Sequence, residues 1–172
     1  MIALLASALF IFGPSCGGKS TLSKALIERL GPSWVCVDRD LLIEDGLCSE
    51  EEADEKLDQT IAYLQSNNLD VLVDTQIPWR PPRNGTEKYV LVYAPLPELI
   101  ARDLRRTQKL ERSSKRAYYA RLYVEETFSQ VFEAPINLHF EYDAIIDSSQ
   151  TQIEEEIEQV FALITTSSKK EP

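Results

Sequence analysis

The chain has little cysteine and a clear deficit of basic residues. Its 172 residues include three cysteines, and the spacing of Cys16, Cys36 and Cys48 forms no paired metal-ligand motif. This composition argues against a disulfide scaffold and favours a reducing compartment, so we expect a cytoplasmic protein. The chain holds 18 lysines and arginines against 28 aspartates and glutamates, a net charge of −10. A general binder of nucleic acid or of an anionic membrane is therefore not expected, whereas a local basic groove is compatible with this charge.

A hydrophobic run of membrane-spanning length is also missing. The most apolar segment, residues 1–12, is too short to cross a bilayer, and we expect no membrane association. The alternative is the core of a signal peptide, but the segment lacks a basic start and continues directly into Gly13. We interpret its second half, "ALFIF", as a buried first strand.

Short apolar runs alternate with amphipathic segments along the rest of the chain. The runs predict five strands, and the segments between them predict helices, one of them capped by Ser49. The pattern is typical of an α/β fold with a five-stranded parallel sheet sandwiched by helices in a single domain, 1–172, with a disordered tail at about 165–172. Ligands of such sheets bind at the carboxyl ends of the strands. The strands are expected at 7–12, 34–37, 70–74, 88–94 and 142–147.

The sequence "GPSCGGKST" follows the first strand and matches the phosphate-binding pattern G-x-x-x-x-G-K-[ST]. Glycines let successive backbone N–H groups point at one anion, the lysine adds a cation, and the serine hydroxyl can bind Mg²⁺. The alternative is a glycine-rich turn without a ligand. The context of strand, loop and helix favours a P-loop NTPase that binds ATP and Mg²⁺, with the nucleotide held by Gly13, Pro14, Ser15, Cys16, Gly17, Gly18, Lys19, Ser20 and Thr21.

The chain lacks the Asn-Lys-x-Asp segment by which GTPases read guanine, and it is short for a motor ATPase. Small kinases remain, which need a base for the acceptor hydroxyl and cations for the charge that builds up during transfer. Asp38 and Asp40 follow the second strand and are the candidate bases. The alternative role for this Asp-Arg-Asp segment is to cap the next helix.

Cations gather between residues 98 and 121 of an otherwise acidic chain. Arg102 and Arg106 are four residues apart and share a helix face. In small kinases a lid in this place brings arginines onto the phosphates and excludes water. We expect a helical, arginine-rich lid at about 107–116; the alternative is a solvated basic helix. The three tyrosines Tyr118, Tyr119 and Tyr123 are expected to pack within the following helix.

The segments "GPSCGGKST", "WVCVDRDLLIE" and "EYDAIIDSS", with the basic helix, resemble the chloramphenicol phosphotransferase-like group of small P-loop kinases over residues 8–150. In that family a Trp lies six residues before the catalytic Asp, as Trp34 does before Asp40. The resemblance therefore implies that Asp40 is the base. It also implies catalytic roles for Arg102 and Arg106. Arg112 matches the lid arginine of the family loosely, because "RTQKLERSS" is longer than the usual lid.

Three further candidate positions lie at the end of the third strand or in the loop after it. Asp74 ends that strand, where P-loop enzymes place a carboxylate that orders Mg²⁺, so we expect Ser20 and Asp74 at the metal; capping the loop is the alternative. In the loop beyond, Trp79 and Arg80 could contact the acceptor, as could Asp38, or this loop could be a stiff surface segment.

Together these features predict an ATP- and Mg²⁺-dependent kinase that phosphorylates a hydroxyl of a small molecule, with Lys19, Asp40, Arg102, Arg106 and Arg112 as its catalytic residues. A polynucleotide 5′-hydroxyl or nucleoside kinase is the first alternative, and the acidic charge makes a nucleic-acid partner unlikely on electrostatic grounds. The second alternative is a nucleotide-binding regulator or a protein-modifying kinase domain. The acceptor and the oligomeric state do not follow from the sequence.

Overall fold

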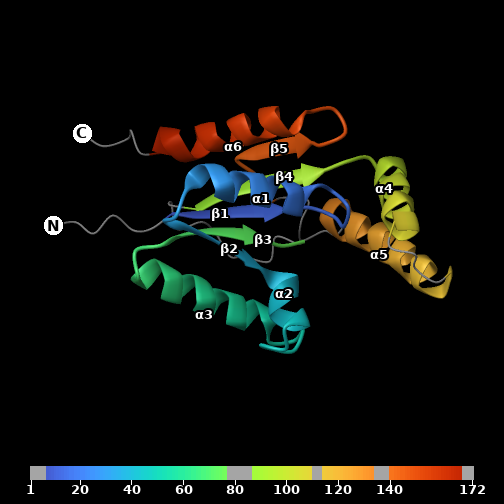
Figure 1. Cartoon of the computed structure of the whole chain (residues 1–172), viewed down its shortest axis with the longest axis horizontal. Helices are drawn as coiled ribbons and strands as arrows, with labels where there is room; N and C mark the ends of the chain where they lie inside the picture. The colour runs from blue at the N-terminus through green and yellow to red at the C-terminus, as the bar shows by residue number, and fades with distance from the viewer. Residues whose placement is uncertain (1–6, 77–86, 110–113, 134–139, 168–172) are drawn as a thin grey trace.

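The computed structural model describes residues 7–76, 87–109, 114–133 and 140–167 (Figure 1). Strands and helices alternate along the chain as the apolar pattern predicts. The strands are β1 (Ala8–Phe12), β2 (Trp34–Asp38), β3 (Asp70–Asp74), β4 (Glu87–Tyr93) and β5 (Ala144–Asp147). The helices are α1 (Lys19–Leu30), α2 (Arg39–Glu44), α3 (Ala53–Ser66), α4 (Leu96–Lys109), α5 (Ser114–Phe132) and α6 (Ile153–Ser167).

The five strands form one parallel sheet in the order β2-β3-β1-β4-β5. In Figure 1 their carboxyl ends point toward α4 and α5, and the chain termini lie beyond the opposite edge. The register aligns Asp74 with Ile11 on one side and with Asp38 on the other. The segments that follow β1, β2 and β3 therefore meet at one edge, where ligands of such sheets bind.

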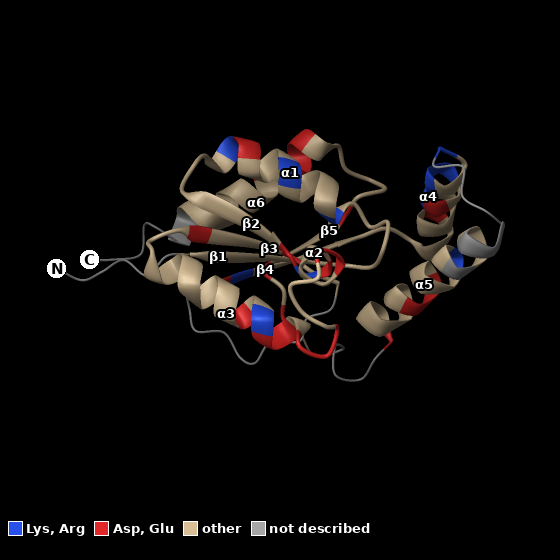
Figure 2. Ribbon diagram, turned by 60° about the horizontal axis from the view of Figure 1, so that its bottom comes forward, with Lys and Arg blue, Asp and Glu red and all other residues tan. Residues whose placement is uncertain are grey.

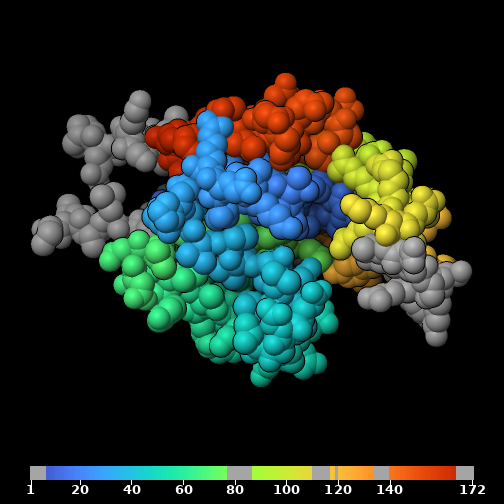
Figure 3. Space-filling model, in the orientation of Figure 1, coloured from blue at the N-terminus to red at the C-terminus, as the bar shows by residue number. Residues whose placement is uncertain are grey.

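Alternate residues of the central strand enter two different cores. Phe10 and Phe12 pack on one face with residues of α3 and α5, and Leu9 and Ile11 pack on the other face with residues of α1 and α6. This period of two buries both faces of the sheet, as a parallel sheet requires. In Figure 3, α6 and α1 lie over the upper part of the molecule and α3 over the lower part.

The helix boundaries differ from the sequence predictions in two places. The prediction that Ser49 caps a helix is wrong: α3 begins at Ala53, and Ser49 instead donates its backbone N–H and its hydroxyl to the Glu52 carboxylate at 3.0 and 2.9 Å. The disordered tail predicted from 165 is wrong for 165–167, which continue α6, because Leu163 and Ile164 pack against the sheet core and hold its last turns. Of the predicted helical lid, residues 107–109 end α4 and residues 114–116 begin α5, whereas 110–113 lie outside the described residues.

In the part of the chain that the structure describes, we find no helix both long enough and apolar enough to traverse a bilayer.

Candidate active site

The backbone of the loop between β1 and α1 needs glycine at two positions. Gly13 has φ +153°, and a Cβ atom there would overlap the carbonyl oxygen of Val92. Gly18 has φ +106° and forms the N-cap of α1, where its left-handed conformation turns the chain into the helix. Gly18 thus places the N-terminal end of α1, which carries a positive partial charge, at the end of this loop.

Lys19 is the buried cation of this loop, 8 % exposed, and its ammonium donates to the carbonyl oxygen of Pro14 at 3.2 Å. Two backbone N–H groups of the loop also form hydrogen bonds with other segments of the chain. The Gly13 N–H donates to the Gln76 carbonyl at 3.3 Å, and the Ser15 N–H donates to the Thr127 hydroxyl of α5 at 3.0 Å. The segment after β3 and helix α5 therefore fix the loop that would bind phosphate.

A cavity of about 460 Å³ opens in front of this loop, and we call it the phosphate-loop cavity. Its other walls come from α4 and from the chain after β5. It is lined by Cys16, Gly17, Gly18, Lys19, Ser20, Thr21, Arg102, Arg106, Ser148, Thr151, Ile153 and Glu156. The predicted loop residues from Cys16 to Thr21 and the two predicted helix arginines thus share one cavity, whereas Gly13, Pro14 and Ser15 lie behind its wall.

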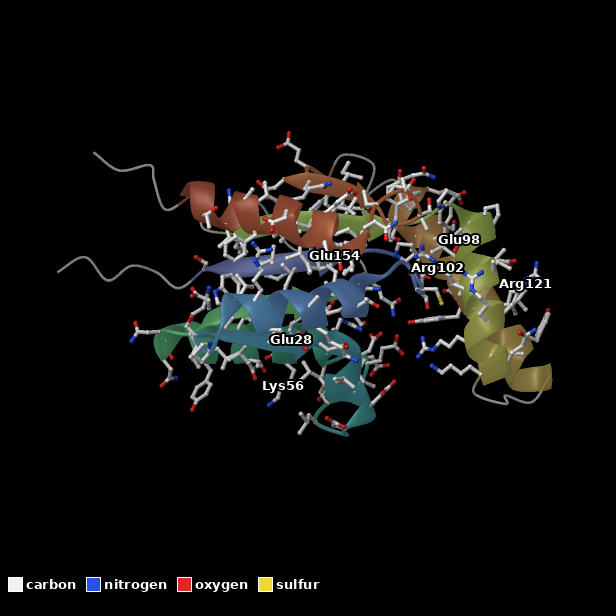
Figure 4. All side chains as sticks on the ribbon, turned by 45° about the horizontal axis from the view of Figure 1, so that its top comes forward. Glu28, Lys56, Glu98, Arg102, Arg121 and Glu154 are labelled. Carbon is white, nitrogen blue, oxygen red and sulfur yellow. The ribbon has the colours of Figure 1, made fainter. Side chains whose placement is uncertain are left out.

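Arg102 braces the phosphate loop from the side of α4 (Figure 4). Its guanidinium donates to the carbonyl oxygens of Cys16 at 3.3 Å and Gly17 at 3.5 Å, and to the Ser148 hydroxyl and carbonyl oxygens, both at 2.9 Å. Its Nε donates to Glu98 at 3.1 Å. The hydrogen bonds from Arg102 and Arg105 hold the pKa of the Glu98 carboxyl below its usual value. Arg102 is therefore a structural brace of the loop in this state.

Arg106 lines the same cavity one helical turn later and is exposed. Within the described residues it makes no ion pair, so its guanidinium is available to a ligand. Ser148, by contrast, is part of the brace: its hydroxyl donates to the Gly17 carbonyl at 2.7 Å. Ser148 follows the last strand in the segment "EYDAIIDSS", and its contact with the phosphate loop was not predicted.

Asp74 and Ser20 could hold a metal ion beside the phosphates. Asp74 is 4 % exposed, and burial raises the pKa of its carboxyl, an effect that the Lys19 ammonium and hydrogen bonds from Ser20 and Ser23 oppose. The Ser23 hydroxyl donates to it at 3.4 Å. A carboxylate and a hydroxyl are the hard oxygen ligands that Mg²⁺ prefers, and a nearby cation would offset the cost of burying the charge. The residues present therefore fit Mg²⁺.

A second cavity, of about 590 Å³, lies on the other side of the sheet edge, and we call it the Asp40 cavity. Residues from α2, the start of α3, α5 and the chain after β3 form it. Its lining is Arg39, Asp40, Ile43, Glu44, Glu50, Asp54, Thr75, Gln76, Tyr123, Glu126 and Gln130. Asp40, the predicted base, is thus in the wall of a cavity.

Asp38 has a different position from Asp40. It is the N-cap of α2, and its carboxylate accepts a hydrogen bond from the Asp40 N–H at 2.9 Å. It is not in the lining of the Asp40 cavity. The prediction of an acceptor contact for Asp38 therefore finds no support in the geometry, whereas the alternative of a helix cap is confirmed.

Gln76 and Tyr123 accompany Asp40 and were missed by the sequence analysis. The Gln76 amide donates to the Asp40 carboxylate at 2.8 Å and to the Tyr123 hydroxyl at 2.6 Å. Burial raises the pKa of the Tyr123 phenol, and the carboxylates of Asp40, Glu50 and Glu126 act in the same direction. The expectation that Tyr123 packs within its helix is wrong: it lines the Asp40 cavity and is 45 % exposed.

Three predicted site residues, Trp79, Arg80 and Arg112, lie outside the described residues. Gln76 could have been found by the rule that selected Asp74, because both lie at the carboxyl end of β3. Tyr123 carries no such signal, since only the packing of α5 beside the sheet edge brings it to Asp40.

No protein-family model matches the chain, and no curated protein matches it. Solved structures match its fold. The shikimate kinase from Bacteroides thetaiotaomicron is 18% identical with a TM-score of 0.59, over 92% of this chain and 98% of that chain. The gluconokinase from Sinorhizobium meliloti 1021 is 15% identical with a TM-score of 0.57, over 94% of this chain and 93% of that chain. A chain of the Pnkp1/Rnl/Hen1 RNA repair complex is 20% identical with a TM-score of 0.58, over 86% of this chain and 51% of that chain.

At such identities the likeness is one of fold, and the chain has the α/β P-loop fold of small kinases. A particular resemblance to the chloramphenicol phosphotransferase-like group stays a prediction.

Proposed function

We propose that the chain is an ATP- and Mg²⁺-dependent kinase that phosphorylates a hydroxyl group of a small molecule. The observation that carries this proposal is the pair of cavities at one sheet edge, one lined by the phosphate loop and the other by Asp40. A regulator that only binds nucleotide needs the first cavity and not the second. Likeness to a shikimate kinase and a gluconokinase supports transfer to a small alcohol.

In the proposed reaction the acceptor hydroxyl lies in the Asp40 cavity, and its oxygen forms a bond to the γ-phosphorus of ATP. The bond between that phosphorus and the β,γ-bridging oxygen breaks, ADP leaves, and the hydroxyl proton passes to Asp40. Gln76 donates to the Asp40 carboxylate and would orient it toward the acceptor. Mg²⁺, held by Ser20 and Asp74, would neutralise charge on the β- and γ-phosphates.

The cations act on the transferred group in this proposal. Lys19 exchanges the Pro14 carbonyl for phosphate oxygens when ATP binds, because a charged acceptor is the stronger partner. Arg106 contacts the phosphates directly, and Arg102 keeps the loop in shape while adding positive charge. Arg112 stays a proposed lid arginine.

Asp40→Asn tests the base. Mixtures of small alcohols are supplied with MgATP, and ADP formation is measured for the wild type and the variant. We expect alcohol-dependent turnover in the wild type, a loss of about 10²–10⁴-fold in Asp40→Asn, and unchanged ATP binding. Asp45→Asn, an exposed carboxylate just after α2, is the matched control and should keep full activity. Full activity in Asp40→Asn would refute the assignment.

A 5′-hydroxyl kinase of polynucleotides is a second candidate, favoured by the likeness to a chain of an RNA repair complex. Transfer of labelled phosphate from ATP to an oligonucleotide with a free 5′-hydroxyl tests it directly. Binding of that oligonucleotide should then weaken steeply with added salt. Absence of both label transfer and salt-sensitive binding would eliminate this candidate.

A further inference from the structure

We propose that the acceptor is a cationic alcohol, a hydroxyl compound that also carries protonated amine groups, and that the acidic wall of the Asp40 cavity selects it. This inference rests on the proposed function, because it names the substrate class of the same site. Apart from Asp40, it concerns charges and contacts that the transfer chemistry itself does not require.

The two cavities carry charges of opposite sign. Among the described residues, five carboxylates and one guanidinium line the Asp40 cavity, a net charge of −4, whereas three cations and one carboxylate line the phosphate-loop cavity, a net charge of +2. Figure 2 shows acidic segments on α2, on the turn after it, at the start of α3 and on α5. Complementarity of charge would direct the anionic triphosphate to one cavity and a cation to the other.

Ion pairs between described residues do not neutralise the negative charge of the Asp40 cavity. Arg39, the one cation in its described lining, donates to Asp54 at 2.7 Å. The other four carboxylates in the wall form no ion pair within the described part of the chain: Asp40, Glu44, Glu50 and Glu126. A ligand with ammonium groups would supply the missing counter-charges.

These carboxylates converge on one place, although they come from separate elements. Asp40 lies on α2, Glu50 follows α2, and Glu126 lies on α5. All three act on the Tyr123 phenol, whose pKa burial and these charges together raise. A solvated acidic face of one helix would not bring three elements to a single side chain.

Thr75 gives an independent sign of a ligand in this cavity. It lines the Asp40 cavity and is 3 % exposed, and its hydroxyl has no hydrogen-bond partner in the described structure. A buried hydroxyl without a partner costs about 1–3 kcal/mol, so such groups in folded proteins usually have a task. The hydroxyl oxygen itself is buried, so a rotation of the Thr75 side chain toward the cavity would be needed for an ammonium N–H or an acceptor hydroxyl to pair with it.

A metal ion is the other cation that acidic side chains attract. Over the described residues, however, no group of three or more His, Cys, Asp or Glu side chains is arranged to hold one. The carboxylates are instead spread around a cavity of about 590 Å³, a volume typical of sites that enclose organic ligands. The geometry therefore favours an organic ammonium compound.

The test uses a matched pair of probes on the full chain loaded with Mg²⁺ and a non-hydrolysable ATP analogue. Kanamycin A presents hydroxyl-bearing rings with several ammonium groups, and its fully N-acetylated derivative keeps the rings and hydroxyls without the charges. Gluconate serves as an anionic alcohol. Calorimetry measures each Kd at low and at high salt. We expect kanamycin A to bind at least about ten-fold more tightly than the other two, with the difference shrinking as salt rises.

Variants then assign the preference to the cavity. Glu50→Gln and Glu126→Gln should each raise the Kd for kanamycin A by about 1.5- to 5-fold, which corresponds to the free energy of an exposed ion pair. Glu28→Gln removes the same charge from the outer face of α1, away from the cavity (Figure 4), and should leave the Kd unchanged. Thr75→Val should weaken binding about 2- to 10-fold without lowering the melting temperature, because it removes a hydroxyl that has no protein partner.

Failure to bind kanamycin A, equal or tighter binding of the uncharged or anionic probe, or an equal loss in Glu28→Gln would overturn the proposal. A lower melting temperature with unchanged affinity in Thr75→Val would overturn the role of that hydroxyl.

The kinase proposal can fail separately. If the cationic preference persists but the wild type neither binds nor turns over ATP, the proposed function fails and the cation site stands. If alcohol-dependent ADP formation occurs only with neutral or anionic alcohols, the kinase stands and the cationic acceptor is eliminated.

Discussion

The Gln76 side-chain amide lies 2.8 Å from the Asp40 carboxylate, and the Gln76 backbone carbonyl accepts a hydrogen bond from the Gly13 N–H at 3.3 Å. One residue at the end of β3 thus contacts both the start of the phosphate loop and the proposed base. The two halves of the site are coupled through it, since a shift of Gln76 would displace the base relative to the phosphates.

Replacing Gln76 by leucine tests this positioning role. The side chain keeps a similar size but can no longer donate to Asp40, while the backbone carbonyl that supports Gly13 is retained. We expect kcat to fall about 10- to 100-fold, because a misplaced base transfers protons poorly, with little change in the KM for ATP. Steady-state kinetics with an alcohol found active in the mixtures measures both constants.

Gln59→Leu on the outer side of α3 is the matched control, since its amide bonds only Glu55, at 3.1 Å, and it should keep wild-type kinetics. Gln76→Asn should retain part of the activity lost in Gln76→Leu. A Gln76→Leu enzyme with unchanged kcat would show that Asp40 is held by other contacts.

Arg102 and Arg106 should respond differently to truncation, although both line the phosphate-loop cavity. Arg102→Ala removes the hydrogen bonds to Cys16, Gly17 and Ser148, so we expect weaker ATP binding and a loss of stability of about 1–3 kcal/mol. Arg106→Ala should lower kcat by about 10³-fold with unchanged stability, because its guanidinium has no partner among the described residues. Urea unfolding and ATP titration distinguish the two effects. Equal stability losses in both variants would contradict the division of roles.

The sequence was most informative where local chemistry determines local geometry. The glycines Gly13 and Gly18 were expected from the motif, and the structure gives both a positive φ at the turn from β1 into α1; the phosphate that this loop and Lys19 would bind stays a prediction. The five strands were found because each is an apolar run of ordinary strand length, and only their ends differ by one or two residues. Asp40 and Asp74 followed from the rule that parallel strands present their carboxyl ends to ligands.

The rest depends on contacts that the sequence does not encode locally. Apart from the family resemblance, the residues alone do not separate Asp38 from Asp40, and the fold of α2 makes the first a cap and places the second in a cavity. Tyr123 lies 83 positions after Asp40 and is brought to it by the position of α5, a tertiary arrangement without a local signal. The charge of the Asp40 cavity emerges in the same way, since its carboxylates belong to separate elements.

Gly13→Ala tests the tight approach of the phosphate loop to β4. The added methyl group would overlap the Val92 carbonyl oxygen, and the loop would have to move. We expect a loss of at least about 2 kcal/mol in unfolding free energy together with loss of ATP binding. Gly31→Ala is the control, because Gly31 also has a positive φ, +87°, but a Cβ there would meet no atom within 4 Å. It should cost about 1 kcal/mol of backbone strain and leave ATP binding intact. Similar effects of both substitutions would mean that strain, and not the contact with Val92, limits position 13.

The phenol of Tyr142 should make the free energy of unfolding depend on pH in the alkaline range. Burial raises the pKa of its phenol to about 12, and its hydroxyl has no hydrogen-bond partner in the part of the chain described. The folded state therefore holds this proton more tightly than the unfolded chain, whose phenol titrates near 10. The corresponding stabilisation is fully present below about pH 10 and is lost as pH rises through about 12. Tyr142→Phe removes this titration and the unpaired hydroxyl together.

We expect Tyr142→Phe to be as stable as the wild type or up to about 1 kcal/mol more stable at pH 9, since the substitution leaves the aromatic packing against Phe12 and Phe140 in place. Between about pH 10 and 12 the difference in unfolding free energy between Tyr142→Phe and the wild type should widen. The reason is that ionisation of this phenol stabilises the unfolded state of the wild type alone. Urea unfolding at a series of pH values measures the difference. Tyr63→Phe, which removes a phenol from a ring that is 68 % exposed, controls for the loss of one hydroxyl. A wild type that loses no stability relative to Tyr142→Phe above pH 10 would show that the Tyr142 hydroxyl has a partner or reaches water.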